Sequence, residues 1–186
     1  MREVLKGFEI DLLARPSHVP DVEETGDTLE ENALLKAKAL VDATGIAAIA
    51  DDTGLFVDAI DGRPGVRSAR FAGEHASYHD NVVKLLDELT GVDCVGRSAS
   101  FRTVIVVAFE DGHSFSVEGV LKGRITEVPR GEQGFGYDPV FAPVNCGGRT
   151  LAEMSATEKN KVSHRALALR ALALQRVFLS GHTGSL

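Results

Sequence analysis

Two neighbouring aspartates follow a short apolar run in the first third of the chain. The run Ile46-Ala47-Ala48-Ile49-Ala50 is typical of a buried strand, and Asp51-Asp52-Thr53-Gly54 comes directly after it. Buried strands of α/β sheets present ligand groups at their carboxyl ends. Two adjacent carboxylates repel each other unless a positive group neutralises them, and Mg²⁺ shared with phosphate oxygens does this well. A turn with an aspartate cap and a glycine at positive φ explains the same residues without a metal.

Acidic and basic side chains also surround the first strongly periodic helical segment. Glu23 and Glu24 precede this segment, at the end where a helix dipole favours negative charge. Lys36 lies within it, where most lysines are solvated or paired along the helix. These residues therefore fit either helix electrostatics or a site for a metal and phosphates.

A glycine-rich segment with two aromatic residues, Gly131-Glu132-Gln133-Gly134-Phe135-Gly136-Tyr137-Asp138-Pro139, lies in the second half of the chain. Its glycines permit close approach of a ligand to the backbone, and Phe135 and Tyr137 could stack on a flat ring. A glycine-rich turn with its aromatic side chains in the core fits equally well. The segment lacks the G-x-G-x-x-G spacing of a dinucleotide-binding turn.

Positive side chains gather before and at the start of the last helical segment. They are Lys159, Lys161, His164 and Arg165, and Ser163 is a possible helix N-cap among them. Lysine and arginine are suited to phosphate oxygens, although a solvated helix face is the usual explanation for two lysines. Acids for a metal, cations for phosphates and an aromatic segment for a base together predict Mg²⁺-nucleotide chemistry. The chain contains neither the Walker motif nor the G-x-S-x-G motif of serine hydrolases.

The composition narrows the class of protein. The 186 residues include 27 acidic and 20 basic side chains, and the net charge of −7 argues against a broad basic face for nucleic acid. The two cysteines, Cys94 and Cys146, form no CxxC motif or disulfide framework, which favours a reducing compartment. No apolar run approaches the roughly 20 residues of a membrane span. We expect a cytoplasmic protein, with residues 1–186 forming one domain and no contact with membrane or nucleic acid.

Helices and strands alternate early in the chain, and a hairpin follows later. Thr28 and Glu31 form a capping box, and Gly45 ends the helix that it begins. We expect helices over 28–45, 77–89 and 155–179, and strands over 8–13, 46–50, 55–60, 99–109 and 114–121. This order predicts an α/β fold with a mixed sheet rather than a purely parallel one.

The motifs in this order resemble those of the inosine/xanthosine triphosphate pyrophosphatases, which remove deaminated purines from the nucleotide pool. The resemblance covers nearly the whole chain and rests on Glu23-Glu24-Thr25-Gly26, Glu31-Asn32-Ala33, Ala50-Asp51-Asp52-Thr53-Gly54-Leu55, Pro64-Gly65 with Ser68-Ala69-Arg70, Gly134-Phe135-Gly136-Tyr137-Asp138-Pro139, and Ser163-His164-Arg165. It implies an elongated, curved mixed sheet flanked by helices, with the active site in a cleft between two lobes. It also implies a homodimer.

The resemblance further implies Mg²⁺-dependent hydrolysis of ITP, dITP and XTP to the monophosphate and pyrophosphate. Asp52 would act as general base and metal ligand, with Glu24 as a second metal ligand, and the residues alone leave open whether Asp51 is the base instead. Thr53 would lie beside the substrate and Lys36 would reach the triphosphate. The purine base would be bound by Phe135, Gly136, Tyr137, Asp138, Lys159, His164 and Arg165.

The chain departs from the family pattern at its start. The family begins with a strand and a Thr/Ser-x-Asn-x-x-Lys phosphate loop, which nothing in this sequence matches. Residues 2–7 instead look like the end of a helix with a glycine cap. We therefore expect the first strand and the phosphate loop to be absent. Two alternative functions follow: a weakly catalytic nucleotide-binding or dimer-forming remnant, and a pyrophosphatase for pyrimidine or methylated nucleotides.

Overall fold

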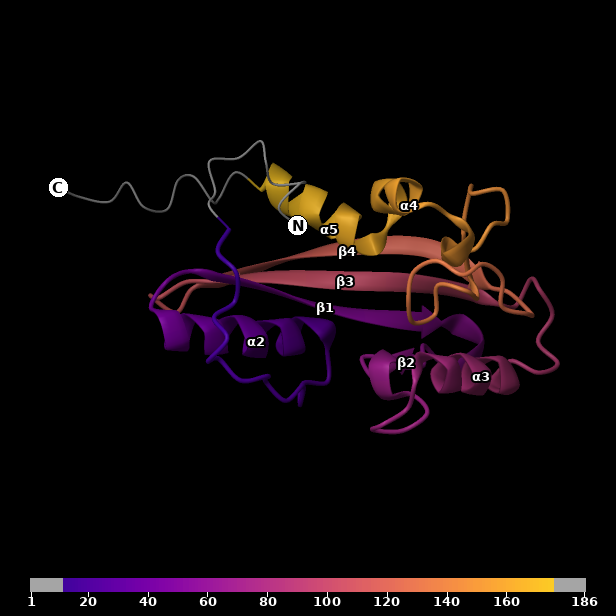
Figure 1. Ribbon diagram of the computed structural model, residues 1–186, viewed down its shortest axis with the longest axis horizontal. Helices are drawn as coiled ribbons and strands as arrows, with labels where there is room; N and C mark the ends of the chain where they lie inside the picture. Colours follow the sequence, from indigo (N-terminus) through magenta and orange to yellow (C-terminus); the bar gives the residue numbers. More distant parts are fainter. Residues whose placement is uncertain (1–11, 176–186) are drawn as a thin grey trace.

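The structure is a computed structural model that describes residues 12–175. Its described part is a five-stranded sheet of order β2-β1-β3-β4-β5 with helices on both faces (Figure 1). The strands are β1 (Ala48–Val57), β2 (Pro64–Gly65), β3 (Ser98–Ala108), β4 (Ser114–Ile125) and β5 (Phe141–Pro143). The helices are α2 (Leu29–Thr44), α3 (Tyr78–Glu88), α4 (Ala156–Val162) and α5 (His164–Leu174). Three 3₁₀ turns are η1 (Asp58–Ile60), η2 (Ser68–Arg70) and η3 (Leu151–Glu153).

The α/β class and the elongated sheet flanked by helices are confirmed. All four pairings between the described strands are antiparallel, whereas the resemblance implies a mixed sheet. The expected strand 8–13 falls mainly outside the described residues, and Leu12 and Leu13 belong to no strand. The chain start, for which we expected the first strand and the phosphate loop to be absent, also lies outside them.

Helix α2 begins and ends where its capping residues predict. The Thr28 hydroxyl accepts a hydrogen bond from the Glu31 amide at 3.1 Å, and the Glu31 carboxylate accepts one from the Thr28 amide at 3.0 Å. Gly45 ends the helix in the left-handed conformation. The helix therefore holds its inward-facing side chains at a fixed place along the sheet.

Strand β1 corrects one expectation. We expected one strand over 46–50 that ends before Asp51 and a second strand over 55–60, but Ala48–Val57 is one continuous strand. Every residue of it pairs with β3, with Asp51 opposite Ile105 and Asp52 opposite Val104. Because successive side chains of a strand point to opposite faces, the two aspartates leave β1 on opposite sides and do not repel each other as neighbours in a turn would.

The sheet packs against helices on both faces. On one face, Ala33 and Ala37 of α2 lie against Val106 and Ala108 of β3. On the other face, Ala168, Leu169 and Leu172 of α5 lie against Ile105, Val107 and Val117. Farther along the sheet, α3 contributes Val82 and Leu85 to a third cluster, which contains Leu55, Val57 and Phe101 of the strands.

The last helical region divides at Ser163. We expected one helical region from 155 to about 179, but Ser163 ends α4 and also caps α5, through a hydrogen bond of 3.2 Å from the Ala166 amide to its hydroxyl. The expected part beyond residue 175 lies outside the described residues. Gly119 of β4 allows α5 to approach, since a Cβ there would lie 2.2 Å from the His164 carbonyl oxygen.

Between residues 12 and 175, no helix has both the length and the apolar character needed to cross a bilayer.

Candidate active site

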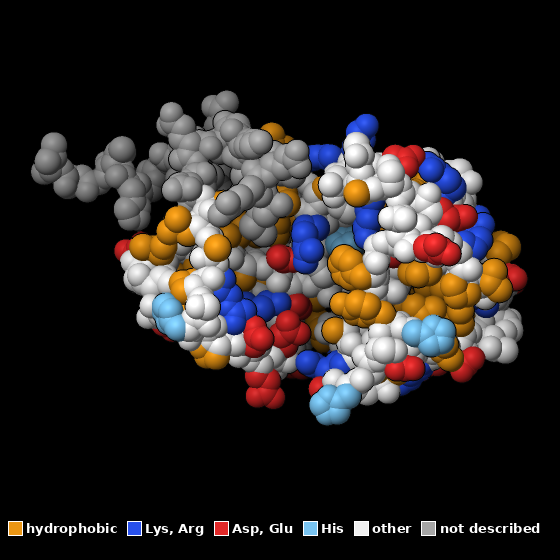
Figure 2. Space-filling view, in the orientation of Figure 1, with side chains coloured by type: hydrophobic (Ala, Val, Ile, Leu, Met, Phe, Trp, Pro, Cys, Tyr) orange, Lys and Arg blue, Asp and Glu red, His pale blue; other side chains and the backbone are white. Residues whose placement is uncertain are grey.

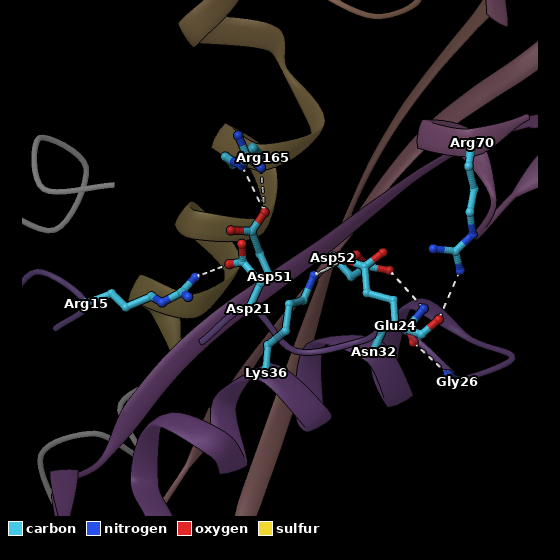
Figure 3. A network of polar contacts seen from close by, with 10 residues as sticks. All are labelled: Arg15, Asp21, Glu24, Gly26, Asn32, Lys36, Asp51, Asp52, Arg70 and Arg165. Carbon is cyan, nitrogen blue, oxygen red and sulfur yellow. Dashed lines mark hydrogen bonds and ion pairs between the residues drawn. The ribbon is translucent and has the colours of Figure 1, made fainter. Parts of the chain in front are cut away.

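A lysine lies between two carboxylates on the face of β1 that α2 covers. Lys36 Nζ donates to Asp52 Oδ1 at 2.8 Å and to Glu24 Oε1 at 3.0 Å (Figure 3). Asn32, one helical turn before Lys36, donates from Nδ2 to Asp52 Oδ2 at 3.4 Å. The i, i+4 spacing on α2 thus directs Asn32 and Lys36 to the same carboxylate. Glu24, Lys36 and Asp52 form the acid–lysine cluster.

Burial and charge together shift the pKa values of Asp52 and Lys36 in the acid–lysine cluster. Burial raises the pKa of Asp52, the Lys36 ammonium counteracts part of this, and Glu24 adds to the increase. Burial by itself lowers the pKa of Lys36, but the hydrogen bonds and negative charges of Asp52 and Glu24 outweigh it and raise the pKa overall. Lys36 is therefore a stable cation, and Asp52 is a stronger base than an exposed aspartate.

The acid–lysine cluster also has the donor types of a Mg²⁺ site. Carboxylate oxygens of Glu24 and Asp52 both lie within 3.0 Å of one cationic nitrogen, so they converge on a point that a cation can share. Across residues 12–175, no group of three or more His, Cys, Asp or Glu side chains is arranged for a metal. Protein Mg²⁺ sites commonly use one or two carboxylates and complete their shell with water and phosphate oxygens. The two carboxylates fit that pattern.

Asp51 lies on the opposite face of β1 and has a different partner. Arg165 donates to Asp51 Oδ2 from Nε at 3.0 Å and from Nη2 at 2.7 Å. The geometry therefore places Asp52, and not Asp51, beside Glu24 and Lys36.

A pocket of about 440 Å³ lies on the same side of β1 as Asp51. One wall comes from η2 and α3, and the other comes from residues 133–138, α4 and α5. Eight residues predicted to bind substrate line it: Thr53, Phe135, Gly136, Tyr137, Asp138, Lys159, His164 and Arg165. Glu24, Lys36 and Asp52 do not line it.

The aromatic residues of the glycine-rich segment differ in accessibility. Phe135 is 60% exposed, and Lys159 Nζ lies 4.9 Å from the centre of its ring. Tyr137 is buried, and its hydroxyl donates to the Ser68 carbonyl at 2.9 Å, while burial raises its pKa. Asp138 is buried, accepts the Phe135 amide at 2.8 Å and pairs with Lys159. Phe135 therefore offers an exposed ring, while Tyr137 and Asp138 hold the segment in shape.

His164 lines the pocket and has a buried ring nitrogen. Its ring stacks on Phe101 with the ring centres 4.7 Å apart. Its Nδ1 is buried and has no hydrogen-bond partner among the described residues. Burial, together with the positive charges of Arg165 and Lys159, lowers the pKa of His164 to about 4. The imidazole is therefore neutral near pH 7, with one ring nitrogen able to donate and the other able to accept a hydrogen bond.

The acid–lysine cluster and the pocket are joined by strand β1. One edge of β1 pairs with β3 along its whole length. Along the other edge, Leu55 and Phe56 are the β1 residues that pair with a described strand, β2. Asp52 and Thr53 are adjacent in β1, so one belongs to the acid–lysine cluster and the next lines the pocket. Figure 2 shows acidic and basic side chains gathered near the middle of this face of the molecule, next to hydrophobic side chains. The two regions are therefore neighbours along β1.

Sequence reasoning assigned no role to several residues of the site. Asn32 is fully buried, accepts a hydrogen bond from the Gly26 amide and donates one to Asp52. Its position one helical turn before Lys36 is the sequence feature that could have indicated its place in the site. Phe101 supports His164 from β3, and no local pattern marks it, because the contact depends on how α5 packs on the sheet. Arg70 hydrogen-bonds the main chain of Glu24, although the two residues lie 46 positions apart.

Comparison with known proteins shows similarity over almost the whole chain. The model of the Ham1 family matches residues 1–175. A protein of Thermoanaerobacter sp. (strain X514) named dITP/XTP pyrophosphatase is 50% identical over 174 residues, which are 92% of this chain and 87% of that protein. A Bacillus subtilis (strain 168) protein of the same name is 45% identical over 174 residues, with the same two shares.

Solved structures agree with the sequence comparison. A HAM1 protein from Coxiella burnetii superposes with a TM-score of 0.86 and 42% identity, over 92% of this chain and 88% of that one. The Staphylococcus aureus Ham1 protein gives a TM-score of 0.77 and 43% identity, over 86% of this chain and 80% of that one.

Proposed function

The chain belongs to the Ham1 family, and from this membership we propose that it hydrolyses deaminated purine nucleoside triphosphates. ITP, dITP and XTP are the proposed substrates, and the products are the nucleoside monophosphate and pyrophosphate. The observation that carries the proposal is the acid–lysine cluster next to a pocket that is lined by the exposed ring of Phe135 and by His164. The names of the related pyrophosphatases support the same reaction.

In the proposed reaction, a water molecule attacks the α-phosphorus of the nucleotide. The water oxygen forms a bond to the α-phosphorus, and the bond from this phosphorus to the bridging oxygen of the β-phosphate breaks. Asp52 accepts the proton of the attacking water, and its raised pKa suits a general base. Pyrophosphate leaves with the electron pair of the broken bond.

Glu24 and Asp52 hold Mg²⁺ in this proposal. When bound, Mg²⁺ neutralises charge on the phosphate oxygens and orients them. Lys36 places a second positive charge beside the same carboxylates, and it can donate hydrogen bonds to phosphate oxygens once a divalent cation balances Glu24 and Asp52. Asn32 fixes the second oxygen of Asp52, so that one oxygen stays directed toward Lys36.

Selection of the base follows from hydrogen bonding in the pocket. Hypoxanthine and xanthine carry a 6-keto acceptor, whereas adenine carries a 6-amino donor. A donor from Lys159, His164 or Arg165 that faces the 6-keto group is left unpaired when adenine occupies the pocket. A site built on such hydrogen bonds discriminates by up to about 10⁴-fold. Phe135 adds stacking that does not depend on the identity of the base.

A substrate panel tests the proposed function. The full chain is incubated with Mg²⁺ and ITP, dITP, XTP, ATP, dTTP or UTP, and pyrophosphate release is measured. We expect kcat/KM for ITP, dITP and XTP to exceed that for ATP by at least about 10²-fold. Equal rates on ATP contradict the proposed base selection, and preference for dTTP or UTP supports the pyrimidine alternative. An absence of turnover supports the weakly catalytic remnant.

The proposal also includes the state of the protein in the cell. We propose a cytoplasmic homodimer in which residues 1–186 act as one pyrophosphatase domain. Light scattering of the purified protein at micromolar concentration measures the oligomeric state, and a mass of one chain contradicts the homodimer.

A further inference from the structure

The segment Ser68-Ala69-Arg70 is part of the family resemblance, yet the proposed mechanism assigns it no role. These three residues form η2, which lies between the acid–lysine cluster and the pocket. Ser68 and Ala69 line the pocket, whereas Arg70 extends toward the loop that carries Glu24 (Figure 3). This one short turn therefore contacts both regions of the site.

The turn is firmly held in the fold. Ser68 Oγ donates to the Gly65 carbonyl at 2.6 Å and accepts the Leu55 amide at 2.8 Å. The carbonyl of Ser68 accepts the Tyr137 hydroxyl at 2.9 Å, and the carbonyl of Ala69 accepts Asn81 Nδ2 at 3.0 Å. Ser68 and Asn81 are buried. Arg70 thus extends from a rigid support, which is what a residue needs if it is to fix the position of another.

Among the described residues, the side chain of Arg70 makes one short polar contact, and it is to the main chain of Glu24. Its Nη2 donates to the Glu24 carbonyl at 3.0 Å. Its other neighbour is Glu74, which is 78% exposed and 3.8 Å from Nε, a distance and exposure typical of a weak surface pair. A guanidinium bonded to a carbonyl is a charge-assisted hydrogen bond, so it is stronger than a neutral one.

Among residues 12–175, the main chain of the loop that carries Glu24 is hydrogen-bonded to α2 only beyond Glu24, at Gly26 and Asp27. The amide of Gly26 donates to Asn32 Oδ1 at 2.7 Å, and the amide of Asp27 donates to Glu31 Oε2 at 2.7 Å. Within the described part of the chain, Arg70 is the group outside this loop that hydrogen-bonds the Glu24 main chain. The loop is therefore held by Arg70 at Glu24 and by the start of α2 at Gly26 and Asp27. These two attachments direct the Glu24 carboxylate toward Lys36.

We propose that Arg70 is a positioning residue that presets the Glu24 carboxylate for the cation and the triphosphate. This inference rests on the proposed function. By holding the Glu24 carbonyl, Arg70 removes conformational freedom that binding would otherwise have to restrict. Through Ser68 and Ala69, the same turn fixes the pocket wall relative to the acid–lysine cluster.

The test compares Arg70→Met and Arg70→Lys with the wild-type protein. Methionine keeps most of the length of the side chain without a donor, and lysine keeps a donor. Glu74→Gln is the matched control, because it removes the other neighbour of Arg70 and leaves the contact with Glu24 in place. Thermal melting and circular dichroism report on folding in every variant.

The first measurement is amide hydrogen exchange over residues 23–27. We expect exchange about 10-fold faster in Arg70→Met, an intermediate rate in Arg70→Lys, and the wild-type rate in Glu74→Gln. The second measurement is Mn²⁺ affinity by electron paramagnetic resonance in the presence of α,β-methylene ITP. We expect weakening by roughly 10-fold or more in Arg70→Met, as for other residues that orient metal ligands.

Binding of IMP separates positioning from a general structural role. IMP lacks the pyrophosphate portion, so its affinity should stay within about 2-fold of wild type in Arg70→Met if Arg70 acts through Glu24. Unchanged exchange at 23–27 together with unchanged Mn²⁺ affinity overturns the inference, and so does an equal loss of IMP affinity. Failure of the proposed function is distinct, since it appears as a wild-type protein without turnover of ITP or XTP, and hydrogen exchange still tests Arg70 in that case.

Discussion

At the scale of single residues, Asp52 owes its proposed role to burial next to a cation. The side chain is only 8% exposed, and it bonds Lys36 and Asn32 at the same time. Its neighbour Asp51 is equally acidic in sequence but lies on the other face of β1, paired with Arg165. Two adjacent aspartates thus have separate environments, and only Asp52 has the surroundings of a general base beside a metal.

Replacement of Asp52 tests that assignment. We expect Asp52→Asn to lower kcat by roughly 10³-fold, because the amide cannot accept the proton of the attacking water. The measurement is pyrophosphate release from ITP, with circular dichroism to confirm folding. Asp51→Asn is the matched variant, and it should change KM more than kcat, because it frees Arg165 of the pocket. An equal loss of kcat in the two variants contradicts the assignment of the base to Asp52.

His164 links the pocket to stability at low pH. Its folded-state pKa of about 4 lies below the ordinary value of 6.5. Between these two pH values the unfolded chain binds a proton that the folded protein does not. The contribution of the neutral histidine to stability is therefore complete above about pH 6.5 and is lost as the pH falls toward 4.

We expect His164→Gln to reduce the loss of stability in acid. A tenfold difference in proton affinity corresponds to about 1.4 kcal/mol, so the wild-type protein should lose about 2 kcal/mol more than the variant between pH 7 and pH 4.5. Urea unfolding of each protein at pH 7 and at pH 4.5 gives the loss in its free energy of unfolding between the two pH values. Parallel losses in the two proteins are inconsistent with a neutral, buried His164.

At the scale of elements, the position of α5 depends on a glycine in β4. A Cβ at Gly119 would lie 2.2 Å from both the His164 carbonyl oxygen and the Ala168 amide nitrogen. Helix α5 begins at His164, so the same contact sets where His164 and Arg165 enter the pocket. Because Gly119 has no side chain, α5 can lie close to β4, and this places His164 and Arg165, two residues predicted to bind the base, in the pocket.

Gly119→Ala tests this contact between sheet and helix. The added methyl group should displace α5 and destabilise the fold by about 1–3 kcal/mol, which is typical of overpacking. It should also raise KM for ITP, because His164 and Arg165 move with the helix. Urea unfolding and steady-state kinetics measure the two effects. Ser114→Ala, at the exposed start of β4, serves as the control and should leave both values unchanged.

At the scale of the whole molecule, the site uses both faces of the sheet across one edge. Helix α2 supplies Lys36 on one face, and α5 supplies His164 on the other. Strand β1 joins them, because its residues alternate between the faces and its outer edge next to Asp52 has no strand partner among residues 12–175. In the proposed function, recognition of the base and chemistry at the phosphates thus rest on separate elements.

This division predicts that the two halves of the site respond to different variants. Phe135→Ala should weaken IMP binding by about 10-fold, since stacking of a base on an aromatic ring is worth about 1–3 kcal/mol. Lys36→Met should leave IMP binding nearly unchanged and weaken binding of α,β-methylene ITP with Mg²⁺. Isothermal titration calorimetry measures both ligands. Equal effects of both variants on both ligands are incompatible with two separable regions.

The sequence by itself determined what depends on neighbours along the chain. Thr28, Glu31 and Gly45 defined α2, because caps are satisfied within a few residues. Ordered motifs brought together acids, cations and a glycine-rich aromatic segment, and eight of the residues so chosen line one pocket. The β3–β4 hairpin was likewise visible from β-branched strands on either side of Asp111-Gly112.

Only the tertiary structure decided what depends on strand pairing and helix packing. The sequence predicts a strand that ends before the polar residues 51–54 and another that begins after them, whereas pairing with β3 keeps them in one strand and separates Asp51 from Asp52. The contacts of Arg70 with Glu24 and of Phe101 with His164 join residues 46 and 63 positions apart. No local pattern encodes such contacts, because they arise only when elements distant in sequence pack on the same sheet.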